Sequence, residues 1–160
     1  MIGERKMENL IKNNKTLVIS SLDKENNPRI SYSPFVYMNN KLYIYISKVA
    51  EHYNNILNNG NISVMIIEDE KDSKSTFDRN RVTFVGKATR IEDNEEIFEE
   101  FSNKQGESIM TMLRKMDFNI FEIVIEKGRY VEGFGKAFDI KNEDNELILE
   151  HVKLDKNHNN

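Results

Sequence analysis

Near its amino end, the chain has three apolar runs separated only by short polar turns. The runs are residues 16–22 (TLVISSL), 28–38 (PRISYSPFVYM) and 41–47 (KLYIYIS), and they are joined by DKENN and by Asn39-Asn40. Runs rich in β-branched and aromatic residues are typical of strands, and a two-residue Asn-Asn link predicts a tight hairpin. Such short turns can join antiparallel strands, whereas parallel strands need a long crossover. The sequence therefore predicts an antiparallel meander.

The remaining chain continues this pattern, with helices placed between further strands. Three stretches have apolar residues at helical spacing: 4–14, 49–59 and 93–116, the last interrupted at Gln105-Gly106. Four more stretches read as strands: 61–67, 81–91, 118–125 and 130–140. We place a turn at 126–128 and expect a mainly β protein, an antiparallel split β-barrel of about seven strands with flanking helices.

Length and composition describe a single domain. The chain has 160 residues, enough for one domain with a core, so we expect residues 1–160 to form one unit with a helical start at about 4–14 and a tail at about 141–160. A net charge of −4 without a basic block argues against a nucleic-acid partner. The absence of cysteine excludes disulfides and thiolate ligands. No apolar run approaches the ~20 residues of a membrane span, and no signal-peptide core is present, so we expect a cytoplasmic protein without a membrane partner.

The strand expected from Tyr130 has an almost bare face. If it continues to Ile140, Val131, Gly133, Gly135 and Ala137 share that face. Glycine weakens a strand, so two on one face indicate close approach of a ligand or of another backbone. Two interpretations stay open: a seat for a flat, metal-bearing ligand, or a barrel strand packed tightly on its neighbour.

The three histidines, His52, His151 and His158, do not have the spacing of a metal cluster, and neither HxH nor HExxH occurs. His52 lies beside the apolar stripe of its helix, where a partly buried polar residue and a ligand are both possible. His151 falls near a strand end. His158, close to the end of the chain, has few neighbours to pack against, which leaves a ligand role or plain disorder.

Two charged residues stand out by position. Arg81 opens a strand after a polar loop, where its guanidinium could pair with a carboxylate or phosphate, or form a surface ion pair. Asp117 lies between a helix end and a strand, as a turn or cap residue or as part of a site. The GxG at 133–135 has no following helix and fails as a dinucleotide fingerprint. No catalytic acid or base is identifiable.

Taken together, several motifs resemble the HugZ/HutZ haem-utilisation family of the pyridoxamine 5'-phosphate oxidase-like, FMN-binding split-barrel superfamily. They are SYSPFV, IS-x-x-A-x-H-x-x-N, SVMIIEDE, F-x-R-x-R-V-T-F and Y-V-x-G-F-G-x-A-F, and the resemblance extends from about Thr16 to His158. It implies a homodimer with haem at the interface and His158 as the axial ligand of the haem iron. It also implies that Asp117 of the other subunit accepts a hydrogen bond from that histidine, which would fix its tautomer.

The same resemblance implies roles for further residues and for the whole protein. Arg81 matches a basic residue near the haem, His52 aligns with a family histidine, and Gly133 and Gly135 fall in the last motif. The implied activity is oxidative opening of the haem ring by O2 and an electron donor, giving a biliverdin-type product and iron. Two alternatives stay open: an FMN-binding oxidoreductase and a haem storage or delivery protein without turnover.

Overall fold

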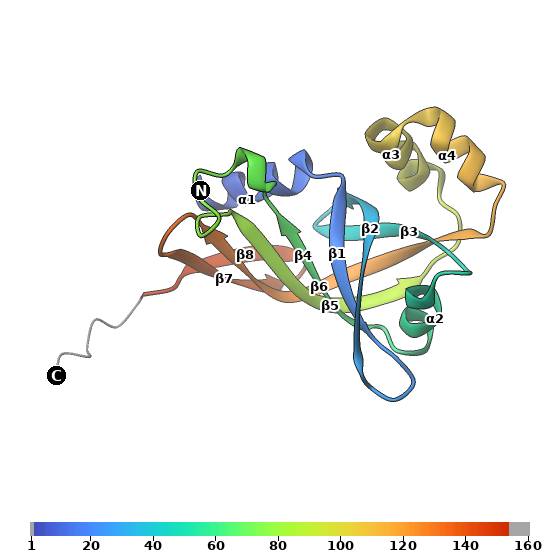
Figure 1. The fold of residues 1–160 in the computed structure, drawn as a ribbon, viewed down its shortest axis with the longest axis horizontal. Coiled ribbons are helices and arrows are strands. Elements are labelled where there is room, and N and C mark those ends of the chain that lie inside the picture. Colours follow the sequence, from blue (N-terminus) through green and yellow to red (C-terminus); the bar gives the residue numbers. More distant parts are fainter. Residues whose placement is uncertain (1, 154–160) are drawn as a thin grey trace.

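The computed structural model describes residues 2–153, which form one eight-stranded antiparallel sheet and four α-helices (Figure 1). The helices are α1 (Ile2–Asn13), α2 (Glu51–Asn58), α3 (Glu95–Gln105) and α4 (Glu107–Arg114), with a single 3-10 turn at Glu70–Asp72. The strands are β1 (Thr16–Leu22), β2 (Pro28–Met38), β3 (Lys41–Ser47), β4 (Asn61–Ile67), β5 (Arg81–Arg90), β6 (Phe118–Glu132), β7 (Lys136–Glu143) and β8 (Glu146–His151). No helix among the described residues combines the length and apolar character needed to span a membrane.

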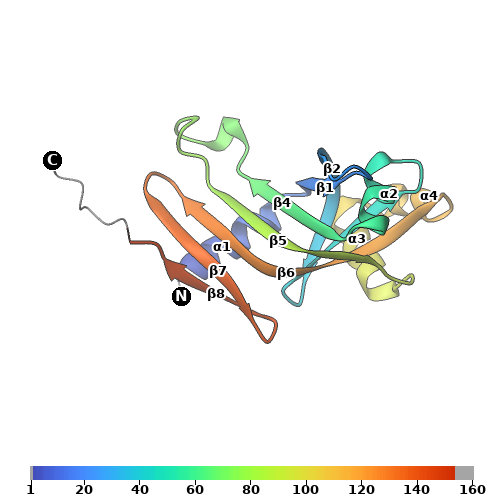
Figure 2. The same ribbon diagram turned by 90° about the horizontal axis from the view of Figure 1, so that it is seen from below.

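Strand β6 closes the barrel. The sheet runs β3-β2-β1-β4-β5-β6-β7-β8, and β3 also pairs with β6, so the first six strands form a ring. The first part of β6 pairs with β3, from Phe118 with Ser47 to Ile123 with Leu42. Its last part pairs with β7, from Lys127 with Lys141 to Glu132 with Lys136. The β7–β8 hairpin therefore extends the sheet beyond the ring (Figure 2).

Two glycines let β5 and β6 approach each other closely. A Cβ at Gly128 would lie 2.3 Å from the Thr83 carbonyl oxygen, and one at Gly86 would lie 2.3 Å from the carbonyl oxygen of Val124. The ladder register shifts between Val85 and Gly86, which marks a bulge. Bulges increase the local twist of a strand, and glycine permits close backbone approach, so both features suit a strongly curved barrel wall.

The apolar side chains form two cores. The larger fills the barrel with side chains from all eight strands, and it is covered by α1, with Met7 and Ile11, and by α2, with Tyr53 and Ile56. The smaller lies between the outer face of β2, β3 and β6 and the helices α3 and α4, with Phe101 fully buried at its centre. Tyr45 of β3 contacts the rings of Phe98 and Phe101 in this second core.

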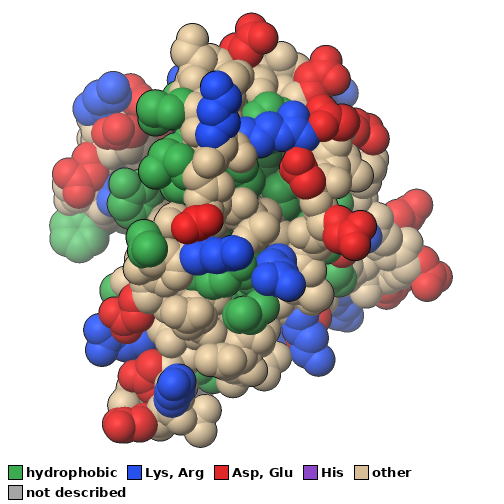
Figure 3. All heavy atoms as spheres, turned by 90° about the vertical axis from the view of Figure 1, so that its right-hand side faces the viewer, with side chains coloured by type: hydrophobic (Ala, Val, Ile, Leu, Met, Phe, Trp, Pro, Cys, Tyr) green, Lys and Arg blue, Asp and Glu red, His purple; other side chains and the backbone are tan. Residues whose placement is uncertain are grey.

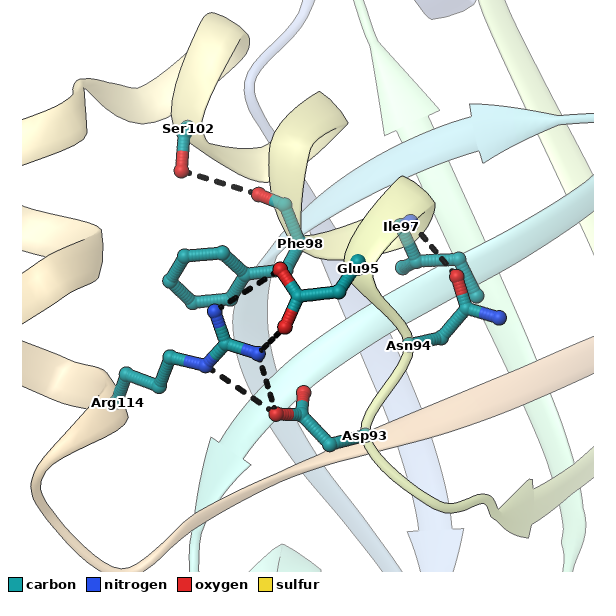
Figure 4. A network of polar contacts seen from close by, with 7 residues as sticks. All are labelled: Asp93, Asn94, Glu95, Ile97, Phe98, Ser102 and Arg114. Atoms are coloured by element: carbon teal, nitrogen blue, oxygen red, sulfur yellow. Dashed lines mark hydrogen bonds and ion pairs between the residues drawn. The ribbon is translucent and has the colours of Figure 1, made fainter.

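An arginine holds α3 and α4 together (Figure 4). Arg114 at the end of α4 forms ion pairs with Asp93, at 2.7 Å, and with Glu95. Its guanidinium also lies 4.1 Å from the centre of the Phe98 ring. The Asn94 side chain caps the start of α3 by accepting the Ile97 N–H at 3.1 Å, which satisfies one of the free amides of the first turn.

Two tight turns are fastened to each other. Asn39 and Asn40 between β2 and β3, and Asp144 and Asn145 between β7 and β8, all have φ between 52° and 66°, as type I′ hairpin turns require. The Asn40 side-chain amide donates to the backbone carbonyl oxygen of Asn145 at 2.8 Å. The Asn145 side-chain amide donates to the backbone carbonyl oxygen of Asn39 at 2.9 Å. The outer hairpin is thereby tied to the barrel at its turn.

Most sequence-based element boundaries are confirmed to within a residue or two, including β1, β2, β3 and β4. The turn predicted at 126–128 is wrong, because β6 runs straight through it and Gly128 serves close approach to Thr83. The single strand predicted over 130–140 is also wrong, because a turn at Gly133 and Gly135 divides it into β6 and β7. Residues 141–151, expected in a tail, complete β7 and form β8, which raises the strand count to eight.

Helix α2 and strand β2 carry buried polar atoms without a hydrogen-bond partner among the described residues. They are His52 Nε2, Asn55 Nδ2 and Ser31 Oγ. Burial lowers the pKa of the half-buried His52 from its ordinary value, and the neighbouring Glu51 carboxylate opposes that shift in part. The imidazole is therefore held in its neutral form, since a proton there would create a poorly solvated charge.

A pair of glycine substitutions tests the close approach of β5 and β6. Gly86→Ala should lower the free energy of unfolding by about 1–3 kcal/mol, because the new Cβ meets backbone that cannot move aside. Gly3→Ala in α1 is the matched control: its Cβ would make ordinary contacts at 3.5 Å with Phe138, and alanine favours a helix by up to about 1 kcal/mol. Urea unfolding measures both. Equal stability of the two variants would contradict the assigned role of Gly86.

The burial of His52 predicts a pH dependence of stability. The unfolded chain binds a proton at His52 near pH ~6.5, and the folded chain binds it only at lower pH, so acid favours unfolding in that window. The free energy of unfolding of the native chain should fall as the pH drops below about 6.5. His52→Gln should remove that part of the dependence. Urea unfolding at several pH values measures the free energy of unfolding of both proteins. If it falls equally with pH in the native chain and in His52→Gln, the burial of His52 does not cause the pH dependence.

Candidate functional site

The candidate residues belong to elements that lie at two opposite ends of the barrel (Figure 1). Arg81, the Gly133–Gly135 turn and the last residue of β8 lie at one end, which we call the hairpin end. Asp117 and His52 lie at the other, together with α3 and α4, and we call it the helical end. Strand β6 runs from one to the other. His158 lies outside the described residues, which end two positions after β8.

At the hairpin end, a closed loop fixes the start of β5. Glu68 and Asn80 at the ends of residues 68–80 bond to each other: the Glu68 N–H donates to the Asn80 carbonyl oxygen at 2.8 Å, and the Asn80 N–H donates to the Glu68 carboxylate at 2.9 Å. Arg79 donates twice to the Glu68 carbonyl oxygen, at 2.9 and 2.6 Å. These bonds hold the backbone of the next residue, Arg81, in a fixed place.

Arg81 itself is half-buried and pairs with Ile67 and Val131 in the sheet. Its guanidinium donates to the Arg79 carbonyl oxygen at 3.3 Å. Among residues 2–153 it forms no ion pair, so most of its donors remain available to a carboxylate or phosphate.

The two glycines of the GxG form a turn with positive φ, +54° at Gly133 and +80° at Gly135. The Gly133 N–H donates to the Asn80 side chain at 2.8 Å, and a Cβ at Gly133 would lie 2.8 Å from the Asp78 carboxylate. The bare strand face expected for these glycines is therefore absent: they serve the turn and its contact with residues 78–80. The link through Asn80 was missed in the sequence, since side-chain-to-backbone bonds between distant loops leave no pattern there.

A polar cavity of about 620 Å³ opens beside this loop, between α1 and residues 68–72. The buried Tyr130 lines it near Glu68 and Glu132. Burial, followed by the charges of these two carboxylates, raises the pKa of Tyr130 to about 12, so its hydroxyl stays protonated at neutral pH. The lining is mainly polar and suits water or a polar ligand better than the face of a flat apolar ligand. Sequence periodicity does not reveal a cavity of this kind.

At the helical end, Asp117 is exposed in the turn between α4 and β6. Its carbonyl oxygen accepts the Lys48 N–H at 2.8 Å, which fixes the turn against the end of β3. The Asp117 carboxylate has no hydrogen bond or ion pair within the described part of the chain. Its side chain is therefore free to meet a group from outside.

His52 lies at the same end, on a helix docked by its neighbour Tyr53. The Tyr53 hydroxyl donates to the Asn119 side chain at 2.7 Å, and its ring meets Phe121 edge-on at 5.1 Å. Asn119 lies two residues after Asp117, so the hydrogen bond from Tyr53 joins α2 to the start of β6, next to Asp117. Within residues 2–153, no three His, Asp or Glu side chains converge into a group that could hold a metal ion.

Comparison with known proteins gives consistent matches. A family model described as pyridoxamine 5'-phosphate oxidase matches residues 4–132. The protein named heme oxygenase HutZ, from Vibrio cholerae serotype O1, is 32% identical over 148 residues, which cover 90% of this chain and 82% of HutZ.

Solved structures support the same relationship. The crystal structure of Campylobacter jejuni ChuZ has a TM-score of 0.83 and 35% identity over 93% of this chain, which spans only 61% of ChuZ. A crystal structure of HutZ, there described as a heme storage protein from Vibrio cholerae, has a TM-score of 0.73 and 31% identity, covering 81% of this chain and 94% of HutZ. The fold, the family model and these identities agree with the motifs: the chain belongs to the HugZ/HutZ family of pyridoxamine 5'-phosphate oxidase-like split-barrel proteins.

Proposed function

We propose that this protein binds haem between two copies of the chain and opens the haem ring oxidatively. The observation that carries the proposal is its 32% identity, over most of its length, with a protein named heme oxygenase. The positions of Arg81 and Asp117 add physical support, because neither charged group forms an ion pair within the described residues.

The two ends of the barrel explain why two copies are needed. Strand β6 has 15 residues, and at about 3.3 Å per residue it separates Asp117 from the hairpin end by up to roughly 45 Å. A single chain therefore holds Asp117 and Arg81 at opposite ends of β6, because Asp117 precedes its first residue and Arg81 pairs with Val131 near its last. In a pair of copies with the helical end of one beside the hairpin end of the other, both residues can border one haem.

Each residue then has a defined task. His158 ligates the iron, and Asp117 of the second copy accepts the remaining ring N–H of that imidazole, fixing its tautomer and strengthening it as a ligand. Arg81 pairs with a propionate, for which its planar donors are suited. His52 lies on α2, at the same end of the barrel as Asp117, where burial favours its neutral imidazole.

The haem itself, with O2 and electrons from a separate donor, supplies the ring chemistry that yields a biliverdin-type product and iron. The chain orients the ring, holds the proton on the ligand imidazole and limits access of water. No residue at either end is assigned as an acid or base for ring opening.

Two other functions have specific support. Haem storage without turnover corresponds to the description of the HutZ crystal structure. An FMN-dependent oxidoreductase corresponds to the description of the matching family model. Both would use the same barrel and the same pair of copies.

The ligand assignment is tested with two histidines near the end of the chain. His158→Ala should weaken haem binding by more than about tenfold and shift the Soret band. Removing the hydrogen-bond partner of a metal ligand already costs about tenfold or more in affinity, and removing the ligand itself should cost more. His151→Ala is the control: His151 ends β8 and packs edge-on against Phe138 at 5.2 Å. Haemin titration followed by absorbance measures both, and the reverse order of effects would reject His158 as the ligand.

Turnover is tested by adding oxygen to the reduced haem complex. Ring opening predicts loss of the Soret band, a biliverdin-type absorption and iron that a ferrous chelator can capture. A haem spectrum that survives repeated cycles of reductant and oxygen would identify storage instead. A parallel titration with FMN should leave no stoichiometric flavin on the protein, and a yellow complex would favour the oxidoreductase.

A further inference from the structure

Helix α4 has an apolar surface that is wider than the part packed against the second core. At about 100° per residue, five apolar side chains of α4 and its following turn occupy an arc of roughly 160°. Met110 is buried and Leu113 partly buried against the second core. Ile109, Met112 and Met116 continue the arc but are 40%, 52% and 56% exposed. We call these three residues the α4 stripe.

The stripe borders the Asp117 turn. Met116 directly precedes Asp117, and the backbone bond from Lys48 to Asp117 brings Val49, 89% exposed, to the same turn. Figure 3 faces this end of the molecule and shows hydrophobic side chains open to solvent among charged ones. Contiguous exposed apolar groups rimmed by charge are typical of a contact surface, and methionine adapts well to such surfaces.

Two exposed aromatic residues belong to the hairpin end: Phe77, 83% exposed in the loop of residues 68–80, and Phe134 in the β6–β7 turn. Phe134 lies between Gly133 and Gly135 at the tip of the β6–β7 turn and is 71% exposed. The turn is not loose, because the Gly133 N–H is bonded to the Asn80 side chain, and Asn80 is bonded to Glu68. Phe134 is therefore an apolar side chain held outward on a supported turn.

We propose that Phe134 of one copy packs against the α4 stripe of a second copy, and that the contact occurs twice in a symmetric pair. The inference rests on the proposed function, because a shared haem site requires the hairpin end of one copy beside the helical end of the other. The two features cannot meet within one chain, since β6 lies between them. In a two-fold pair each contact is repeated with the roles exchanged.

Both surfaces carry charges of both signs, and these can pair across the contact. Exposed Lys136 lies two residues from Phe134, and exposed Glu107 lies two residues before Ile109. Residues 92–107 carry a net charge of −6, whereas the stripe's own stretch, residues 108–117, carries Arg114, Lys115 and Asp117, a net charge of +1. At the hairpin end, residues 127–141 carry a net charge of +2, and the neighbouring loop of residues 68–80 carries −2. Opposite charges that pair across a contact orient two surfaces toward each other.

The absence of cysteine from the chain permits a direct test by disulfide trapping. The double variant Phe134→Cys/Met112→Cys, purified without haem and mildly oxidised, should run mainly as a covalent dimer on a non-reducing gel. Mass spectrometry should find the peptide pair 134–112. A disulfide needs Cβ atoms within about 4.5 Å, so the bond reports the contact itself. Both side chains are exposed, so neither substitution disturbs a core.

The two single variants and Phe134→Cys/Val85→Cys are the controls. Val85 is 39% exposed on the barrel wall, comparable with Ile109, and should yield little cross-linked product. A 134–134 bond, equal cross-linking in the Val85 control, or no 134–112 bond would overturn the proposal, and so would light scattering that shows the native chain to be a monomer.

The haem titration separates this proposal from the proposed function. If the 134–112 bond fails to form but haem binding still depends on His158, the docking surface is wrong and the haem site stands. If the bond forms in haem-free protein while His158→Ala binds haem normally, the docking surface stands and the haem ligand is wrong.

Discussion

The pairing of β3 with β6 is the interaction on which the rest of the structure depends. It turns an eight-stranded sheet into a six-stranded ring with an outer hairpin, and it places the two ends of β6 at opposite poles of the molecule. The cost is a strongly curved wall, and Gly86 and Gly128 make that curvature possible by letting the β5 and β6 backbones approach. The distance between Asp117 and Arg81 follows from this closure.

The fold was largely readable from the sequence because its signals are local. Strand periodicity and paired turn residues located β1 to β4, and Gln105-Gly106 marked the break between α3 and α4. The glycines after Phe118 were misread because the same residue serves two purposes. Gly128 allows close approach within a strand, and Gly133 and Gly135 allow positive φ in a turn, and the apolar alternation on either side does not distinguish them.

The candidate site was predictable in its residue types but not in its arrangement. Arg81 and Asp117 could be selected because each begins or precedes a strand next to a polar segment, yet their separation depends on β6 running unbroken for 15 residues, through the turn predicted at 126–128. The support of Arg81 by Glu68, and of the Gly133 turn by Asn80, depends on contacts between distant loops. The α4 stripe resembled an ordinary core face, since only the packed structure shows which apolar residues the barrel leaves uncovered.

The paired asparagine turns also set the order in which the molecule can be completed. A ribosome delivers the β2–β3 turn long before the β7–β8 turn, so Asn39 and Asn40 are already in place when Asn145 arrives. The two bonds between the turns can form only when both turns are present. The anchoring of the outer hairpin at its turn is therefore a late event in the life of the chain, since it joins residues more than a hundred positions apart.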